Sequence, residues 1–487
     1  MKLNVIYGRS GSGKSEYIYK DISEKMQNNQ VFLIVPEQCN LSAEKKLFDI
    51  SRKTSLIKAE VLTMSRMAYR VLNEVGENIS HLSKTGKDML IFDLLNKEKN
   101  NLRFLGKSEK NIEIVNRMFT EFKKHNISLD MLLDVKTENE YTNLKVKDIT
   151  NLFDKYENKL SNNYIDENDS LTNLCKYLDK TDMFKNAIIY IDEFLGFTKQ
   201  EYNVFEKLLG QCLEVNVCIP IDNLKIGSLE KDIFFFNKKF ANNLIKIAND
   251  YSCEVDLFEL TESYRFKTSE LKFLEKNFDV TNSKYEGVTK NINLFLANNP
   301  YSEIENVGKQ IHNLVKNCGY KYSEIGVICE DIEKYSEDVK AIFNKYDIPL
   351  FVDEKKELNQ NLLIKFVIAI LDIFANNWSY ESVFNYLKIG LLDFREDEIF
   401  LLENYCRKWG IKGKKWYLKE FDYEDVNDKQ ECFENIRKRI VKPLLELKEK
   451  ISNNKTAKQI TKELYSFLID NNILTNLDSK IKLYNNI

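Results

Sequence analysis

A glycine-rich segment near the N-terminus has the residue types and spacing of a phosphate-binding loop. Residues 8–15 read Gly-Arg-Ser-Gly-Ser-Gly-Lys-Ser and match the pattern G-x-x-x-x-G-K-[ST] in full. In this pattern the glycines let backbone N–H groups face phosphate oxygens, the lysine reaches the β- and γ-phosphates, and the last hydroxyl binds Mg²⁺. A chance glycine turn is the alternative. The sequence therefore predicts an ATP·Mg²⁺ site made by Gly8, Arg9, Ser10, Gly11, Ser12, Gly13, Lys14 and Ser15.

Two adjacent carboxylates form the second element of this candidate site. Asp192 and Glu193 directly follow the apolar run 187–191, which is typical of a central strand covered on both faces. At the carboxyl end of such a strand, Asp192 would share the Mg²⁺ with Ser15, and Glu193 would orient or deprotonate the attacking water. Alternatively, the two acids cap the helix that follows. These residues support nucleotide binding more strongly than hydrolysis.

Four further polar residues are candidates for contacts with the nucleotide or with DNA. Arg265 is a candidate for stabilising charge on the γ-phosphate, with a surface salt bridge as its alternative role. Gln38 follows the second predicted strand, and Ser65 and Arg66 follow the third. These three would lie at one end of the sheet and offer polar groups to a DNA strand, with turn and cap roles as the alternative.

The segments around these residues alternate between strand and helix. Strands that alternate with helices predict a parallel sheet, and the loop at 8–15 makes the expected fold an α/β P-loop NTPase (RecA-like) fold. Residues 84–179 are charged, helical and almost free of strand signals, which indicates a large helical insertion. The predicted strands are 2–7, 31–35, 61–64, 187–191 and 215–219, and the predicted helices are 17–26, 43–50 and 65–75.

A second strand–helix series begins near residue 290. Strands are predicted at 292–296 and 325–329 with a helix at 303–315 between them, and the pattern is helical from Leu362 onward. The predicted domains are a first RecA-like ATP-binding lobe (1–83 and 180–285), a helical insertion (84–179), the start of a second RecA-like lobe (286–360) and a truncated helical insertion (361–487).

Composition and charge describe an ordinary globular protein of several units. Of the 487 residues, 43% are hydrophobic and 30% are charged, which is enough apolar material for several cores. The net charge of -3 argues neither for nor against a nucleic-acid partner, so any basic groove must be local. Nine scattered cysteines and three histidines fit neither a zinc site nor a disulfide framework. With no apolar leader and no stretch long enough to span a bilayer, we expect a cytoplasmic protein without a membrane partner.

Seven blocks of the chain resemble one known family, the AddB subunit of the AddAB-type ATP-dependent helicase/deoxyribonuclease, a relative of the UvrD-like superfamily 1 helicases. Besides the glycine-rich loop they include Val-Pro-Glu-Gln at 35–38 and Tyr-Ile-Asp-Glu-Phe at 190–194. The blocks keep their order over nearly the whole chain. They are 8–15, 35–38 with 42–44, 61–72, 190–194 with 197–201, 264–265, 348–353 and 386–391.

This resemblance implies one half of a heterodimer that processes DNA double-strand ends for recombinational repair. The partner would be an AddA-like helicase-nuclease, and single- and double-stranded DNA would be bound. Family members are more than twice as long and continue into a nuclease domain and an iron–sulfur cluster, whereas this chain ends at Ile487. The resemblance therefore implies an N-terminal fragment that binds ATP with weak hydrolysis and holds neither the exonuclease site nor the cluster.

The chain departs from typical superfamily 1 helicases in two places. Only seven residues precede Gly8, where an adenine-reading glutamine is usual, and residues 220–224 read Pro-Ile-Asp-Asn-Leu in place of Gly-Asp-x-x-Gln. Both departures agree with a degenerate helicase that contributes DNA recognition. Two other functions stay open, a P-loop small-molecule kinase and a non-hydrolysing ATP-binding scaffold. The long helical insertion argues against the kinase.

Overall fold

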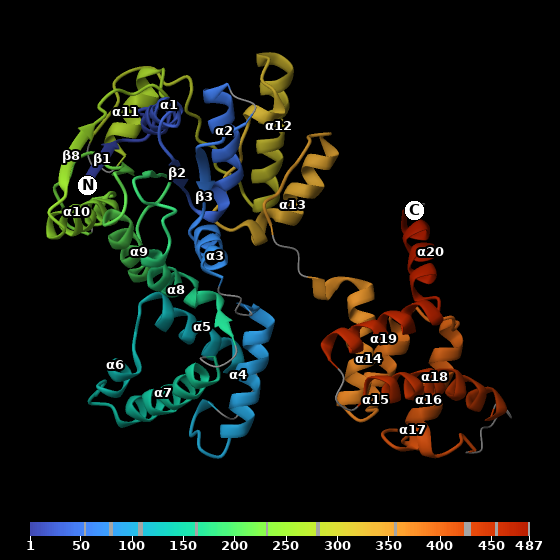
Figure 1. Cartoon of the computed structure of the whole chain (residues 1–487). Helices are drawn as coiled ribbons and strands as arrows, with labels where there is room; N and C mark the ends of the chain where they lie inside the picture. The colour runs from blue at the N-terminus through green and yellow to red at the C-terminus, as the bar shows by residue number, and fades with distance from the viewer. Residues whose placement is uncertain are drawn as a thin grey trace. The chain divides into compact units, whose positions relative to one another are not determined.

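The chain forms two units, Met1–Leu294 and Phe295–Ile487, and each is described by itself (Figure 1). The computed structural model describes residues 1–52, 55–76, 81–105, 111–160, 164–229, 232–278, 283–354, 358–422, 430–452 and 456–485. No helix in these ranges combines the length and the apolar character that a membrane crossing requires.

A six-stranded, all-parallel sheet forms the centre of the first unit. Its strands are β1 (Lys2–Gly8), β2 (Val31–Ile34), β3 (Ala59–Leu62), β6 (Ile188–Ile191), β7 (Glu214–Pro220) and β8 (Glu254–Glu259), in the order β3-β2-β6-β7-β1-β8. Val5 of β1 lies beside Val217 of β7 on one side and beside Leu257 of β8 on the other. The parallel sheet confirms the predicted α/β class and is consistent with a RecA-like fold.

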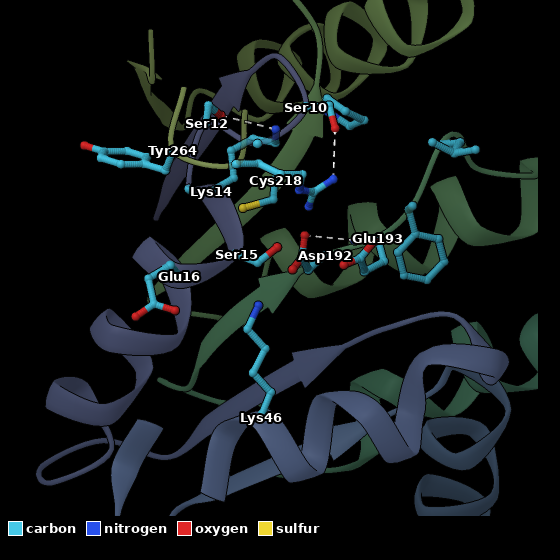
Figure 2. Close-up of a pocket in the computed structure, with 16 residues that line it drawn as sticks. Ser10, Ser12, Lys14, Ser15, Glu16, Lys46, Asp192, Glu193, Cys218 and Tyr264 are labelled. Atoms are coloured by element: carbon cyan, nitrogen blue, oxygen red, sulfur yellow. Dashed lines mark hydrogen bonds between the residues drawn. The ribbon is translucent and has the colours of Figure 1, made fainter. Parts of the chain in front are cut away.

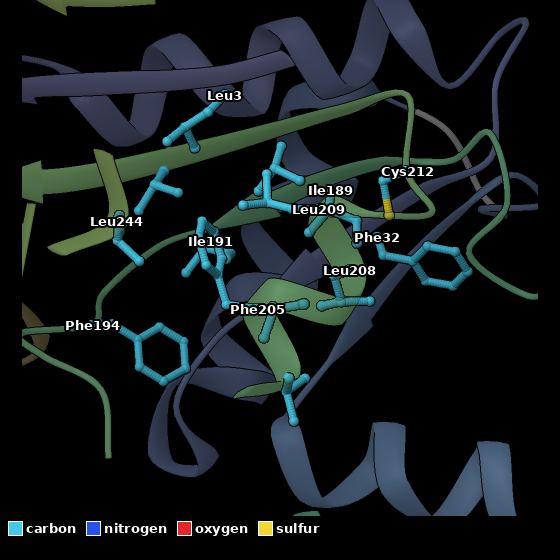
Figure 3. Close-up of a cluster of buried hydrophobic side chains, with 14 of the residues drawn as sticks. Leu3, Phe32, Ile189, Ile191, Phe194, Phe205, Leu208, Leu209, Cys212 and Leu244 are labelled. Carbon is cyan, nitrogen blue, oxygen red and sulfur yellow. The ribbon is translucent and has the colours of Figure 1, made fainter. Parts of the chain in front are cut away.

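Side chains of the central strands alternate between two apolar cores. Ile189 and Ile191 of β6 face one core, Ile188 and Tyr190 face the other, and all four are buried. Figure 3 shows Phe205 in the first core. Because helices pack on both faces of the sheet, the strands are held in place, and so are the loops that follow them. The helices over the first core are α3 (Met64–Val75), α8 (Ser170–Tyr177), α9 (Lys199–Leu209) and α10 (Phe235–Asp250), and those over the second are α1 (Lys14–Lys25) and α2 (Asn40–Ser51).

A helical insertion with a core of its own lies in sequence between α3 and α8. Its elements are β4 (His81–Leu82), α4 (Lys84–Glu98), α5 (Asn111–Lys124), α6 (Leu129–Leu133), α7 (Glu140–Leu160), β5 (Ile165–Asp166) and η3 (Glu167–Asp169). Phe119 of α5 packs against Phe153 and Tyr156 of α7, with ring centroids 5.1 and 4.9 Å apart. The helix α8, which follows the insertion, belongs to the sheet instead, because its Leu174 is buried in the first core of the sheet. The remaining short elements of this unit are η1 (Glu37–Cys39), η4 (Leu178–Lys180) and α11 (Ser269–Asn277).

All the regular elements in the described part of the second unit are helices. One of its cores contains the fully buried Phe366, Trp378 and Trp416, and a smaller one contains Ile304 and Phe343. The helical character predicted from Leu362 onward is confirmed. The elements are α12 (Pro300–Cys318), η5 (Tyr322–Glu324), α13 (Ile332–Lys345), η6 (Leu358–Gln360), α14 (Leu362–Ala375), α15 (Tyr380–Lys388), α16 (Glu396–Trp409), α17 (Lys415–Leu418), α18 (Gln430–Ile451), α19 (Ala457–Asp470) and α20 (Ile473–Asn485).

The two strands predicted at 292–296 and 325–329 are absent, although both segments lie within the described residues. Leu294 and Ile328 are 100% and 96% exposed. A strand needs a neighbouring backbone to complete its hydrogen bonds, and the described part of the second unit offers no strand as a neighbour. The two strand predictions are therefore wrong for this structure. The helix predicted at 303–315 is confirmed within α12.

Candidate functional site

A pocket of about 550 Å³ opens at the carboxyl edge of the sheet, beside the loop that follows β1 (Figure 2). Because all the strands are parallel, their carboxyl ends meet at this edge, which is where open α/β sheets bind ligands. Charged side chains of both signs are among the lining residues. They are Lys14, Lys46 and Arg265, and Glu16, Asp192 and Glu193.

The glycines of the loop allow a close approach of the segment that follows β8. Gly11 has φ +78°, and a Cβ atom at this position would lie 2.6 Å from the Cβ of Arg265. The backbone N–H of Tyr264 donates to the Gly11 carbonyl at 2.9 Å. Gly13 has φ +85° and precedes the first turn of α1. Other residues would be strained at both positions, so the loop conformation depends on these two glycines.

Lys14 is turned back onto its own loop. Its Nζ atom donates to the carbonyl oxygens of Gly8 at 2.7 Å and Arg9 at 3.0 Å. Burial lowers the pKa of Lys14, because removal from water disfavours its charged form. A cation that is partly desolvated in this way attracts an anionic ligand strongly.

Asp192 directly follows the last residue of β6 and is only 5% exposed. Its Oδ1 atom accepts a hydrogen bond from the backbone N–H of Glu193 at 2.9 Å, whereas Oδ2 has no hydrogen-bond partner among the described residues. Burial raises the pKa of Asp192, and the Glu193 carboxylate raises it further, while the Glu193 backbone N–H and the nearby Ser15 hydroxyl offset part of that rise. Figure 2 shows the Ser15 and Asp192 side chains directed toward each other. A buried carboxylate oxygen and a hydroxyl are oxygen donors of the kind that Mg²⁺ prefers, so these residues fit a magnesium ion.

Glu193 lies next to Asp192 in a left-handed backbone conformation with φ 65°. The alternative role for the two acids, as caps of the following helix, does not hold. The helix α9 begins at Lys199, and Thr198 caps it by accepting the N–H of Glu201 at 3.3 Å. A non-glycine residue with positive φ at a pocket wall is a frequent feature of functional sites.

The two arginines of the candidate site have different surroundings. Arg265 donates from Nη1 to the Ser10 hydroxyl at 3.2 Å, so it lies beside the loop, and the alternative surface salt bridge is not seen among the described residues. The Nε atom of Arg9 lies 2.9 Å from Glu275 of α11, and its guanidinium stacks over Phe234. The pocket lining therefore brings together residues 10–15 with Asp192, Glu193 and Arg265, whereas the Arg9 side chain is directed away from it.

The three DNA-binding candidates lie at the carboxyl ends of neighbouring strands, outside the pocket lining. Gln38 is exposed in η1, and Ser65 is exposed in α3, where Thr63 rather than Ser65 is the helix cap. The Nη1 atom of Arg66 pairs with Glu44 at 3.0 Å. Its charge is therefore already partly neutralised by the chain itself.

Lys46 and Cys218 are among the pocket-lining residues that the sequence did not predict. A signal for Lys46 was present, since it follows Ala43 by three residues and precedes Leu47, both of which are buried on one face of α2. A lysine on the buried face of a helix is unusual and points to a special role. Cys218 lies in the apolar strand β7 and gives no such signal.

Fold and site together define the class, which is a RecA-like α/β protein with a glycine-rich loop, a lysine and a buried aspartate at one sheet edge. A family model described as ADDB, N-terminal matches residues 5–275, which is more than half of the chain. The chain belongs to this AddB family.

Curated relatives agree with this assignment. Proteins named as the B-type subunit of an ATP-dependent helicase/deoxyribonuclease are 36% identical over 99% of this chain in Clostridium botulinum (strain Loch Maree / Type A3) and 37% identical over 96% in Clostridium kluyveri. A third from Clostridium tetani is 37% identical over 99% of the chain. The chain spans 44%, 43% and 45% of these relatives' lengths, respectively.

Proposed function

We propose that the chain binds ATP together with Mg²⁺ in the pocket at the carboxyl edge of the sheet. The observation that carries this proposal is the buried Asp192 carboxylate, whose Oδ2 atom has no hydrogen-bond partner among the described residues. A buried polar group without a partner costs about 1–3 kcal/mol, and more when it is charged. A divalent cation shared with the Ser15 hydroxyl would remove that cost.

The other pocket residues would act on the phosphates. Bound Mg²⁺ would neutralise charge on the phosphate oxygens. Lys14 would exchange the carbonyl oxygens that it now contacts for β- and γ-phosphate oxygens, while backbone N–H groups of residues 10–15 donate to the phosphates. Arg265, beside Ser10, would stabilise charge on the γ-phosphate, and Glu193 would orient or deprotonate the attacking water.

We further propose that this site serves a DNA-processing complex. Relatives that match over 99% of the chain are named as one subunit of an ATP-dependent helicase/deoxyribonuclease. The chain would be the helicase-like part of such a subunit, paired with an AddA-like helicase-nuclease, and would help to process DNA double-strand ends for recombinational repair. All nine cysteines are free, which suits the reducing cytoplasm as its location.

DNA would contact the exposed ends of the neighbouring strands β2 and β3. Gln38 and Ser65 offer uncharged polar groups there. Arg66 would have to release Glu44 before its guanidinium bound a phosphate of the DNA backbone.

The proposed function is tested by measuring ATP binding and hydrolysis with and without DNA, on the chain alone and together with an AddA-like partner. Binding of ATP·Mg²⁺ by the chain, with turnover that changes when DNA and the partner are added, supports it. Failure of the chain to bind ATP at all would refute it. ATP binding with no turnover in any combination would identify the non-hydrolysing scaffold instead.

A further inference from the structure

Lys46 projects from α2 into the nucleotide pocket from the side opposite the glycine-rich loop. Figure 2 shows its side chain reaching toward Ser15 and Asp192, whereas Lys14 lies on the other side of these two residues. The Nζ atom of Lys46 also lies 4.6 Å from the ring centroid of Tyr19, a buried residue of α1. This cation–π contact holds the ammonium group near the pocket rather than in bulk solvent.

No ion pair of Lys46 is found among the described residues, although other lysines of this unit have one. Lys25, for example, pairs with Asp21 at 3.0 Å and with Glu214 at 2.9 Å. The ammonium group of Lys46 therefore has hydrogen-bonding capacity for a further anionic partner in the pocket.

We propose that Lys46 binds the terminal phosphate of a nucleoside triphosphate and makes the site prefer triphosphates over diphosphates. The inference rests on the proposed function, which assigns the β-phosphate to the loop side of the pocket, around Lys14. A third phosphate would extend from the loop toward Asp192 and Glu193, which is the side that Lys46 approaches. A lysine ammonium group is a point charge on a flexible stem and can reach such an oxygen without a fixed geometry. Lys46 would thus contact a group that is present in ATP and missing from ADP.

The test compares nucleotide affinities of three variants of the 487-residue chain. Lys46→Met removes the charge but keeps an apolar side chain over Tyr19, and Lys46→Arg keeps the charge. Lys45→Met is the matched control, because Lys45 is the preceding residue of the same helix and is exposed. Binding of the non-hydrolysable ATP analogue AMP-PNP and of ADP is measured in Mg²⁺ by displacement of a fluorescent nucleotide.

Lys46→Met is expected to weaken AMP-PNP binding by about 10-fold or more, the usual effect of losing a charge-assisted hydrogen bond, and to change ADP binding by less than about twofold. Lys46→Arg should keep most of the wild-type preference for AMP-PNP over ADP, and Lys45→Met should leave this preference unchanged. Equal losses for AMP-PNP and ADP, or no loss for either, would overturn the inference while leaving the proposed function intact. Wild-type protein that binds neither nucleotide would overturn both.

Discussion

The backbone N–H of Glu193 donates to the Oδ1 atom of Asp192 at 2.9 Å, and this contact separates the roles of the two adjacent acids. It holds one Asp192 oxygen in place, while Oδ2 stays without a partner among the described residues. Because the backbone of Glu193 provides this contact, its carboxylate is not needed for it. Asp192 is therefore suited to hold a cation, and Glu193 is suited to act on a water molecule.

The substitution Glu193→Gln is expected to reduce ATP turnover by about 100-fold or more while changing ATP affinity by less than about twofold. The substitution removes a general base, which typically contributes about 10²–10⁴ in rate, but it keeps the backbone N–H that binds Asp192. Turnover is measured by phosphate release and affinity by equilibrium titration. Glu16→Gln is the control, since Glu16 is an exposed acid at the rim of the same pocket. Equal turnover in wild type and Glu193→Gln would contradict the role given to Glu193.

The chain alone is expected to hydrolyse ATP slowly, with little stimulation by DNA. In phosphoryl-transfer enzymes, an arginine that stabilises charge on the γ-phosphate contributes about 10³–10⁵ in rate. Arg265 is exposed to solvent and donates to Ser10, so we expect it to stabilise charge on the γ-phosphate only weakly. Phosphate release is measured with and without single-stranded DNA. Turnover at or above about 10 s⁻¹ that depends on DNA would show that the first unit and Arg265 suffice.

Purified chain is expected not to degrade DNA. Within the residues that the structure describes, no group of at least three His, Cys, Asp or Glu side chains could hold a metal ion. The measurement is incubation of linear duplex and single-stranded DNA with the chain and Mg²⁺ or Mn²⁺. Degradation that a point mutation within this chain abolishes would refute the prediction.

Acid is expected to destabilise the second unit through the Glu434–Arg437 pair. Arg437 donates from Nε and Nη2 to the two carboxylate oxygens of Glu434 at 2.7 and 2.6 Å. Burial raises the pKa of Glu434, but the hydrogen bonds from Arg437 and from the N–H of Phe421 outweigh it and lower the pKa to about 2. A glutamate in the unfolded chain titrates near about 4.3. The pair therefore stabilises the folded state fully above about pH 4.3, and this stabilisation is lost as the pH falls toward 2. The reason is that the carboxylate of Glu434 binds a proton more tightly in the unfolded chain than in the folded one.

Glu434→Gln should therefore lower the free energy of unfolding at neutral pH by about 2 kcal/mol, with solvent screening allowed for, and should flatten its pH dependence below about 4.3. All three tryptophans, at 378, 409 and 416, belong to the second unit, so their fluorescence during urea unfolding reports on this unit. Glu446→Gln is the control, because Glu446 is an exposed glutamate on the same helix. Identical pH profiles for wild type and Glu434→Gln would contradict the account.

The sequence allowed the centre of the fold and most of the pocket to be predicted, because their signals are local. The strand at 188–191 is a continuous apolar run, and the loop at 8–15 is a contiguous motif, so neither depends on distant residues for its recognition. The edge strand β8 was missed because its residues are largely exposed and Glu254, Asp256 and Glu259 interrupt the apolar pattern. An edge strand pairs on one side only, so its sequence carries a weaker burial signal.

What the sequence could not provide is the direction of side chains that depend on distant partners. Arg9 belongs to the loop motif, yet Glu275, which is 266 residues away, holds its guanidinium outside the pocket. Lys46 enters the pocket because α2 packs over the sheet beside α1, and this placement follows from tertiary structure. The apolar runs at 292–296 and 325–329 have the local pattern of strands but lack the neighbouring backbone that a strand requires.

The central claim, that the loop at 8–15 binds the phosphates of ATP, is tested most directly by titrating AMP-PNP·Mg²⁺ into wild type and Lys14→Ala. The substitution removes the lysine ammonium from the loop but leaves Gly11 and Gly13 unchanged. We predict that wild type binds and that Lys14→Ala loses about 10- to 100-fold in affinity or all detectable binding, whereas Lys20→Ala, an exposed site on the same helix, does not. An unchanged affinity in Lys14→Ala would contradict the account.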